Sequence, residues 1–295
     1  MVIVTSLKNS EKLAKQIAKN IKGTYSKTEV STFPDGDMYL KFSSKLKGQK
    51  LVIVESFQPN SNDALLNIIF AAKNAKSLGA KKVVLVCPYL AFMRQDKRFN
   101  DGEAINAQIM SNLLNNSGLD RIITIDPHLH RIKKMKDIFT IQAENLTAND
   151  IIADFIGSKF KNEIVIGPDW ESYQWADKIS ARLGVEDTVL EKTRSTSRKV
   201  SVEVKKEITI KGKNVIIVDD IISTGNTMIK ALKEAKKRGA KSVTAIGVHG
   251  LFVEKAYEKM KKAGFDNIYT VNTIEHKSNK IDITKLISDK LKKNI

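Results

Sequence analysis

Short runs of β-branched residues, each followed by a helical pattern, recur along the chain. Runs of four or five apolar residues predict buried parallel strands. They occur at Val2–Thr5, Leu51–Val54, Val83–Cys87, Ile122–Ile125, Ile164–Ile166, Val215–Val218 and Val243–Val248. Two of the helical stretches between them stop at Gly79 and Gly239. This alternation predicts an α/β fold in which a central, mainly parallel sheet is flanked by helices.

Part of this pattern occurs twice. The segment Gly48–Ser56 matches Gly212–Asp220 at an offset of 164 residues, and Gly79–Val83 matches Gly239–Val243 at an offset of 160 residues. Strand–helix–strand units resemble one another, so a single match is weak evidence, but two matches in order favour a duplication. We therefore expect two related domains.

Length and composition fit two such domains. The chain has 295 residues, of which 42% are hydrophobic and 28% charged, and only five are prolines. It is therefore globular, and it is longer than one hydrophobic core usually serves. We expect an N-terminal domain over 1–147 and a C-terminal domain over 148–295, with the boundary near Glu144–Asp150 and the last helix as a candidate to pack on the first domain.

The charge is strongly basic, with a formal net charge of +17 at pH 7. Such a charge fits nucleic acid, an acidic surface or anionic small substrates as partners. Lysines at helical spacing, however, usually form solvated helix faces. Only 6% of the residues are aromatic, whereas a nucleic-acid groove needs aromatic side chains among its cations. We expect no nucleic-acid partner.

Membrane and disulfide signals are weak. No apolar run approaches the roughly 20 residues of a membrane span, and Met1–Thr5 does not begin a secretion signal. Cys87 is the only cysteine, which excludes an intrachain disulfide and a cysteine-based zinc site. These features predict a cytoplasmic protein without a membrane partner.

The segment after the expected strand Val215–Val218 carries the strongest local signal. It reads Asp219-Asp220-Ile221-Ile222-Ser223-Thr224-Gly225-Asn226-Thr227 and leads into a helix that runs to Arg238. A helix N-terminus offers unpaired N–H groups to a phosphate, and the threonine hydroxyls add donors. The two carboxylates suit the vicinal hydroxyls of a sugar, or a magnesium ion through water. An ordinary capped helix behind two solvated aspartates explains the same residues equally well.

Four motifs together resemble one enzyme family. Asp219–Thr227 is similar to the ribose-5-phosphate-binding loop of type I phosphoribosyltransferases and of ribose-phosphate diphosphokinases. Three further motifs favour the diphosphokinases: Phe33–Asp37 resembles their adenine-binding loop, Pro88–Asp96 their ATP motif, and Asp126–His128 their metal and diphosphate site. A phosphoribosyltransferase has no reason to carry these three motifs. The resemblance covers nearly the whole chain and implies two related domains of the type I phosphoribosyltransferase kind.

The resemblance implies a role for each matching residue. The residues expected to bind ATP are Phe33, Asp35, Gly36, Asp37, Arg94, Gln95 and Asp96. Those expected to bind ribose 5-phosphate are Arg194, Asp219, Asp220, Ser223, Thr224, Gly225, Asn226 and Thr227. The expected metal ligands are His128 and Asp169, and the expected catalytic residues, on a flexible loop, are Lys192 and Arg194. No role is implied for His130, which has no match in the motif.

The same resemblance implies the reaction and its partners. A transferase of this family moves the diphosphoryl group of ATP to the anomeric hydroxyl of ribose 5-phosphate with Mg²⁺, giving phosphoribosyl pyrophosphate and AMP for nucleotide biosynthesis. It also implies a homo-oligomer, a dimer or larger, in which the adenine loop of one subunit reaches the ATP site of a neighbour.

Each motif also has an ordinary explanation. Phe33–Asp37 is by default a turn bent by its proline and glycine. Arg94 is by default part of a charged surface turn, although an arginine pairs with phosphate oxygens bidentately in a way that lysine does not. Lys192 and Arg194 lie by default in a polar hairpin tip. A type I phosphoribosyltransferase, a catalytically silent homologue and a basic nucleic-acid binder are the rival functions.

The first copy of the repeat serves as an internal comparison. Where the second copy has the phosphate loop, the first has Phe57–Asp63, which contains no glycine and contains a proline that lacks an N–H. This segment is not expected to hold a phosphate in the same way. We therefore expect one sugar-phosphate site in each chain.

Overall fold

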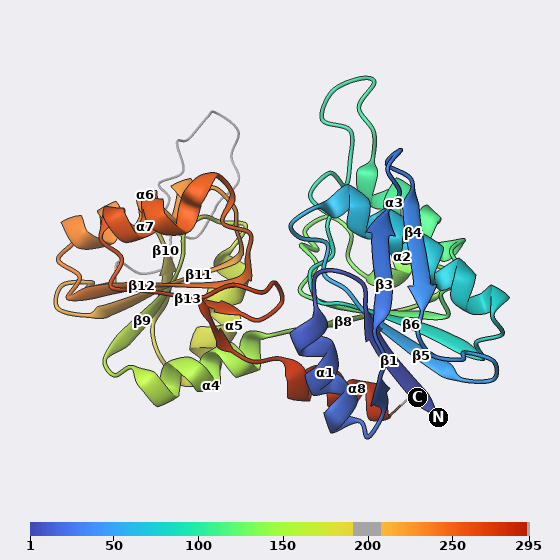
Figure 1. The fold of residues 1–295 in the computed structure, drawn as a ribbon. Helices are drawn as coiled ribbons and strands as arrows, with labels where there is room; N and C mark the ends of the chain where they lie inside the picture. Colours follow the sequence, from blue (N-terminus) through green and yellow to red (C-terminus); the bar gives the residue numbers. More distant parts are fainter. Residues whose placement is uncertain (191–207, 294–295) are drawn as a thin grey trace. The chain divides into compact units, whose positions relative to one another are not determined.

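The computed structural model describes residues 1–190 and 208–293, which form two compact units (Figure 1). Unit 1 comprises Met1–Thr147, Thr273–Glu275 and the residues from Ile283 onward. Unit 2 comprises Ala148–Asn272 and His276–Asp282. The end of the chain therefore belongs to unit 1 although unit 2 precedes it in the sequence.

Unit 1 is a six-stranded sheet covered by helices on both faces. All neighbouring strands are parallel, in the order β2 (Thr24–Tyr25), β1 (Val2–Ser6), β5 (Lys50–Val54), β6 (Lys82–Cys87), β7 (Arg121–Ile125) and β8 (Gln142–Leu146). The helices are α1 (Glu11–Asn20), α2 (Ser61–Ser77), α3 (Asn106–Asn115) and α8 (Thr284–Lys292), with a 3₁₀ turn η1 at Met135–Asp137. Helices α1 and α8 pack together on one face, and α2 and α3 cover the other (Figure 1).

Unit 2 has the same architecture. Its six parallel strands follow the order β10 (Asp187–Val189), β9 (Glu163–Gly167), β11 (Asn214–Ile222), β12 (Ser242–Gly250), β13 (Asn267–Val271) and β14 (Asn279–Ile281). The helices are α4 (Asn149–Lys159), α5 (Tyr173–Leu183), α6 (Asn226–Lys237) and α7 (Ala256–Ala263), with a 3₁₀ turn η2 at Val253–Lys255. Helices α6 and α7 lie on one face of the sheet, and α4 and α5 on the other (Figure 1).

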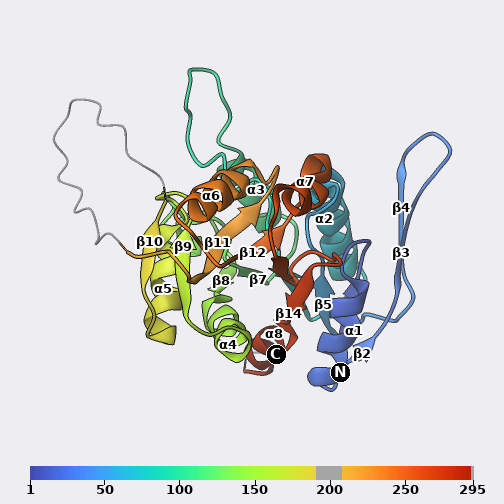
Figure 2. The same ribbon diagram turned by 90° about the vertical axis from the view of Figure 1, so that its left-hand side faces the viewer.

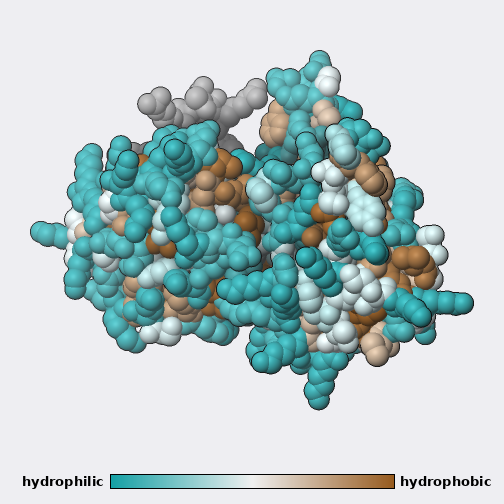
Figure 3. All heavy atoms as spheres, in the orientation of Figure 1, coloured by the Kyte–Doolittle hydropathy of each residue, from teal (hydrophilic) through white to brown (hydrophobic). Residues whose placement is uncertain are grey.

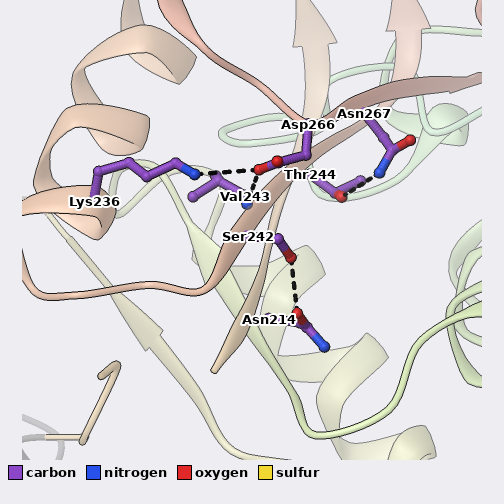
Figure 4. Close-up of polar contacts among 7 residues, drawn as sticks. All are labelled: Asn214, Lys236, Ser242, Val243, Thr244, Asp266 and Asn267. Atoms are coloured by element: carbon purple, nitrogen blue, oxygen red, sulfur yellow. Dashed lines mark hydrogen bonds and ion pairs between the residues drawn. The ribbon is translucent and has the colours of Figure 1, made fainter. Parts of the chain in front are cut away.

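The two sheets have corresponding strand orders, which confirms the predicted pair of related α/β domains. The likeness extends to single contacts at the amino ends of the strands. In unit 1 the carboxylate of Asp120 accepts hydrogen bonds from the Val83 N–H and the Lys76 Nζ, both at 2.7 Å. Unit 2 repeats this arrangement, which is drawn in Figure 4. The carboxylate of Asp266 accepts hydrogen bonds from the Val243 N–H at 2.7 Å and from Lys236 Nζ at 3.3 Å. A shared detail of this kind fits duplication of one ancestral unit.

The predicted strands are present, and the largest difference from the predicted bounds is at the end of β11. Strand β11 continues to Ile222 and does not stop at Val218 as predicted, because β12 runs alongside it to Gly250. The pairing includes Asp219 with Gly247 and Ile221 with His249. The two carboxylates expected in a turn therefore lie in the last part of a strand.

Hydrophobic side chains fill the space between sheet and helices, and polar ones cover the outside. Strand residues such as Val52, Ile166 and Ile217 are fully buried. Hydrophilic side chains dominate the surface visible in Figure 3. In the part of the chain that the structure describes, none of the helices combines the length and the apolar character that crossing a membrane requires.

Candidate active site

The carboxyl ends of β9 and β11 are the expected place for a ligand in unit 2. In open parallel sheets, ligands bind beyond the carboxyl ends of the strands, where the strand order reverses. This reversal occurs between β9 and β11, since β10 lies outside β9 and β12 follows on the other side of β11. Asp169 follows β9, and Asp219 and Asp220 lie near the end of β11, so three of the predicted residues share this edge.

The predicted phosphate loop is a tight turn between β11 and α6. Gly225 has φ of +75° and is the N-cap of α6, which begins at Asn226. The first N–H groups of a helix have no partner within it, and the helix dipole makes this end positive. Asn226 and Thr227 are exposed in the first turn, whereas Ser223 and Thr224 are half-buried. The backbone is therefore arranged as a donor site for an anion, as the sequence predicts.

Gly225 is required for a further reason that the sequence did not reveal. A Cβ built at this position would lie 2.9 Å from Cγ of Met260 and 3.5 Å from Cβ of Ala256, both on α7. The glycine thus allows α7 to pack directly against the loop, in addition to permitting the positive φ.

Three carboxylates concentrate negative charge at this edge. Burial, followed by the charges of Asp220 and Asp169, raises the pKa of Asp219 well above its ordinary range. Asp220 is buried, and its N–H donates to Oδ1 of Asp219 at 3.0 Å. Clustered carboxylates of this kind fit either a divalent cation or a sugar diol as a ligand.

Asp169 lies in a turn that its own hydrogen bonds hold. Its Oδ1 accepts from the N–H of Ser172 at 2.9 Å and from the Ser172 hydroxyl at 2.8 Å. The turn is tight, because a Cβ on Gly167 would lie 2.8 Å from Cα of Tyr173. Trp170, next to Asp169, is 36% exposed and its ring lies 5.9 Å from the ring of Tyr173. Asp169 therefore has a fixed position before any ligand binds.

A cavity of about 230 Å³ opens beside this turn. Its lining combines the turn after β9 (Pro168 and Asp169) and Leu190, which follows β10, with residues of α6 (Thr227, Lys230, Ala231 and Glu234). Lys230 brings a cation to the side of Asp169 and Thr227, which suits a phosphorylated ligand. The predicted catalytic residues Lys192 and Arg194 follow Leu190 in the sequence and lie outside the described residues.

Three of the predicted ATP residues, Arg94, Gln95 and Asp96, lie between β6 and α3. Arg94 is exposed. The Gln95 side chain accepts from Asn106 and its carbonyl accepts from the N–H of Ala107, so this residue braces the start of α3. The Asp96 side chain is only 2% exposed and pairs with Arg131 at 3.0 Å. Arg94 is therefore the side chain of this group that is presented to solvent.

His128 lies beyond β7 in a compact turn with unusual backbone angles. Asp126 has φ of +36° and His128 has φ of +50°, which is uncommon for residues other than glycine and is often found at functional sites. Nδ1 of His128 lies 3.2 Å from Nε2 of His130, with the ring centroids 4.1 Å apart. The sequence assigned no role to His130, yet the structure joins the two imidazoles. The spacing of the two histidines, with one residue between them, was the signal available.

The predicted adenine loop is the tip of an antiparallel hairpin formed by β3 (Thr28–Thr32) and β4 (Met38–Phe42). Figure 2 shows this hairpin extending away from the sheet of unit 1. Phe33 is 51% exposed and makes an edge contact with Tyr39 at 5.6 Å. Asp35 accepts from the N–H of Asp37, and Gly36 supplies a φ of +94°. An exposed aromatic ring at a projecting tip is available to a base.

The equivalent edge of unit 1 is occupied by its own carboxylate. Glu55, at the position of Asp219 in the repeat, is fully buried and accepts from the N–H groups of Leu7, Lys8 and Asn9 at 2.9 to 3.0 Å. Burial raises its pKa to about 7, against the opposing effect of these hydrogen bonds. The donors that follow β1 are thus used internally, which agrees with one sugar-phosphate site per chain.

Comparison with known proteins decides the family. Residues 2–118 match the model described as the N-terminal domain of ribose phosphate pyrophosphokinase, and residues 134–284 match the phosphoribosyl transferase domain. A ribose-phosphate pyrophosphokinase of Sulfolobus acidocaldarius is 35% identical over 271 residues, which cover 90% of this chain and 91% of that protein. The chain belongs to the ribose-phosphate pyrophosphokinase family.

Other pyrophosphokinases show the same extent of likeness. The enzyme of Methanobrevibacter smithii is 34% identical over 294 residues, covering 96% of this chain and 97% of the relative. The crystal structure of phosphoribosylpyrophosphate synthetase from Mycobacterium smegmatis has the same fold, with a TM-score of 0.86, 24% identity and coverage of 99% of this chain and 98% of that one. The predicted pyrophosphokinase resemblance is confirmed, and the chain is an enzyme of nucleotide biosynthesis.

Proposed function

We propose that this pyrophosphokinase transfers the diphosphoryl group of ATP to the anomeric hydroxyl of ribose 5-phosphate, giving phosphoribosyl pyrophosphate and AMP. The observation that carries the proposal is the turn at Gly225, where the N–H groups at the start of α6 lie directly beside the carboxylates of Asp219 and Asp220. A turn of backbone donors next to a diol acceptor matches the two ends of a ribose phosphate.

The substrate orientation follows from these groups. The 5-phosphate accepts from the N–H groups and hydroxyls of the loop, contributed by Ser223, Thr224, Gly225, Asn226 and Thr227. The two aspartates accept from the ribose hydroxyls. With both ends held, the anomeric oxygen is directed at the β-phosphorus of ATP, and positioning of this kind supplies much of the rate in phosphoryl transfer.

ATP is assigned to the motifs of unit 1. Arg94 pairs with phosphate oxygens, Gln95 and Asp96 shape the segment around it, and Phe33, Asp35, Gly36 and Asp37 receive the adenine of a neighbouring subunit. This assignment makes the active form a homo-oligomer, since a hairpin tip of one subunit completes the ATP site of another. The compartment is the cytoplasm, where ATP and ribose 5-phosphate are available.

Magnesium fits the donors present. The carboxylates of Asp169, Asp219 and Asp220 at the edge of unit 2 offer the hard oxygen donors that Mg²⁺ prefers, and the family resemblance assigns the imidazole nitrogen of His128 in unit 1 as a further ligand. When bound with the nucleotide, the ion supplies charge neutralisation at the diphosphate. Lys192 and Arg194 are assigned the role of stabilising the negative charge that develops on the transferred diphosphoryl group.

Product analysis tests the proposal. The purified chain is incubated with ATP, ribose 5-phosphate and Mg²⁺, and the products are identified by mass spectrometry. The expected result is phosphoribosyl pyrophosphate and AMP in equal amounts, and neither when ribose 5-phosphate is omitted. A type I phosphoribosyltransferase would instead consume phosphoribosyl pyrophosphate with a base, and a silent homologue would form no product, so either of these results contradicts the proposal.

A further inference from the structure

The phosphate loop rests on a second layer formed by the segment that follows β12. The carbonyl of Ile222, the last residue of β11, accepts from the N–H of Leu251 at 3.0 Å and from the N–H of Phe252 at 3.1 Å. Helix α7 begins just beyond this segment and packs Met260 against Gly225. The position of Phe252 therefore determines where β11 ends and where α7, the helix that packs against Gly225, begins.

The segment that carries Phe252 has an unfavourable backbone. Phe252, Glu254 and Lys255 have φ values of +46°, +53° and +59°, a region that L-amino acids rarely adopt. A Cβ at Gly250 would lie 2.5 Å from the Phe252 ring, so the ring is pressed onto the glycine. Such a conformation persists only where the surroundings hold it.

The surroundings of Phe252 include an aromatic cluster with His276 at its centre. The centroids of Phe252 and His276 are 4.6 Å apart with the rings inclined by 35°, which is a tilted stack. Tyr257, on the first turn of α7, lies 5.0 Å from the His276 ring and 5.4 Å from the Phe252 ring. One imidazole thus contacts both the strained segment and the helix.

The imidazole itself is held in one orientation. Nδ1 of His276 accepts from the N–H of Ser278 at 3.2 Å, and the Ser278 hydroxyl lies 2.7 Å from Nδ1 and 2.7 Å from the hydroxyl of Thr270 on β13. The backbone N–H of His276 donates to Oδ1 of Asn279 at 2.8 Å. Because Nδ1 is an acceptor, the ring is neutral with its proton on Nε2. The ring is therefore anchored to the sheet of unit 2.

We propose that His276 is a positioning residue for the ribose 5-phosphate loop. Its ring transmits the fixed geometry of the β13–β14 turn to Phe252, and through Phe252 to the end of β11 and to α7 against Gly225. The inference rests on the proposed function, since it concerns the same loop. It adds His276, a residue outside the loop motif, which acts through its contacts with Phe252 and Tyr257.

The test compares substitutions at this contact with a control elsewhere in unit 2. His276→Ala removes the ring, whereas His276→Phe keeps a ring that can stack on Phe252. Phe252→Leu removes the ring on the other side and serves as a second measurement if His276→Ala does not fold. The control is Phe155→Ala, which removes an aromatic contact of 5.2 Å with Tyr269 and lies on α4, on the face of the sheet opposite α6 and α7.

Calorimetric titration of ribose 5-phosphate and steady-state kinetics provide the readouts. We expect His276→Ala to weaken ribose 5-phosphate binding about tenfold and to raise its KM similarly, because a small displacement of a positioned group has large effects. The KM for ATP stays within about twofold, and His276→Phe recovers most of the affinity, because it preserves the stacking contact. Phe155→Ala lowers the melting temperature with ribose 5-phosphate affinity unchanged.

Three results would overturn the inference. The first is an affinity of His276→Ala, or of Phe252→Leu in its place, equal to that of Phe155→Ala. The second is an equal loss of ATP and ribose 5-phosphate affinity, which indicates general destabilisation. The third is no recovery in His276→Phe. In each of these cases the proposed function still stands if the wild-type protein forms product and binds ribose 5-phosphate. If the wild-type protein does neither, the proposed function and the inference about His276 are both overturned.

Discussion

Glu55 and Asp219 occupy equivalent positions in the two units, but their carboxylates have different surroundings. Glu55 is enclosed and accepts from three backbone N–H groups of its own chain. Asp219 faces two further carboxylates, Asp220 and Asp169. The same position in the repeat therefore holds a loop together in unit 1 and leaves negative charge for a ligand in unit 2.

The titration of Glu55 predicts how stability depends on pH. Its pKa is about 7 in the folded chain against 4.5 for the free side chain, so between these values the folded chain binds more protons than the unfolded one. The free energy of unfolding therefore falls as pH rises through this window, by about 3 kcal/mol for this group. Denaturant titrations at about pH 5 and about pH 8 measure the change in wild type and in Glu55→Gln. An equal pH dependence in both proteins would show that Glu55 does not titrate in this window.

Substitution of Gly225 should impair the use of ribose 5-phosphate selectively. Gly225→Val places a side chain at φ of +75° against Met260, which displaces the loop or α7. We expect the KM for ribose 5-phosphate to rise at least about tenfold while the KM for ATP changes little. Steady-state kinetics with each substrate varied in turn provide the measurement.

Gly212 offers the matched control for this substitution. It has φ of +76°, and a Cβ there would meet nothing within 4 Å, so Gly212→Val introduces the same kind of backbone strain at the opposite end of β11. It should lower stability without changing the ratio of the two KM values. Equal changes in both KM values for Gly225→Val would contradict the assignment of the loop.

At the level of elements, the C-terminal helix shows how a local charge network fixes the architecture. The carboxylate of Glu144 on β8 accepts from Nε of Arg121 at 2.7 Å, and Lys290 of α8 pairs with the same carboxylate. The Arg121 side chain is fully buried, and Ile287 and Leu291 bury the apolar face of α8. Helix α8 is therefore part of unit 1 through both burial and charge.

This network predicts unequal effects for its members. Glu144→Ala leaves a buried guanidinium without its carboxylate, which should cost about 3 to 5 kcal/mol of unfolding free energy. Lys290→Ala removes a partner that is 34% exposed, and should cost about 1 kcal/mol or less. Denaturant titration of both variants distinguishes the two. Similar losses would mean that the buried pair has no special weight.

Much of this element-level description was predictable, and the remainder has physical reasons. β-branched runs located the strands because parallel strands are buried on both faces. The end of β11 was predicted too early, since Asp219 and Asp220 suggested a turn although Ile221 and Ile222 continue the pairing with β12. The last helix was expected as a candidate to pack on the first domain, but the contacts that hold α8 on unit 1, such as Glu144 with Lys290, join residues far apart in sequence and leave no local pattern.

The candidate site likewise contains residues that the sequence predicted and residues that it did not. Asp169, Asp219 and the loop around Gly225 were predicted from motif and helix-start chemistry, and the structure brings them to one edge of unit 2. His130 and His276 were not predicted. The spacing of His128 and His130 was a local signal for the first contact, whereas the contacts of His276 depend on packing between distant segments, which leaves no local signature.

For the whole molecule, duplication has produced two similar scaffolds with different uses. Both units keep the lysine–aspartate contact at the amino ends of their strands, shown for unit 2 in Figure 4. At the carboxyl ends they differ, because unit 2 has a glycine turn before α6 and unit 1 has Phe57, which is fully buried, before α2. The account therefore assigns ribose 5-phosphate to unit 2 alone.

The most direct test of this assignment is the number of ribose 5-phosphate molecules bound per chain, measured by calorimetric titration without ATP. Gly225→Val and Asn60→Val change the N-cap residues of α6 and α2, the equivalent positions in the two units. The account predicts one site per chain in wild type, retained in Asn60→Val and lost in Gly225→Val. Two sites per chain, or unchanged binding in Gly225→Val, would contradict it.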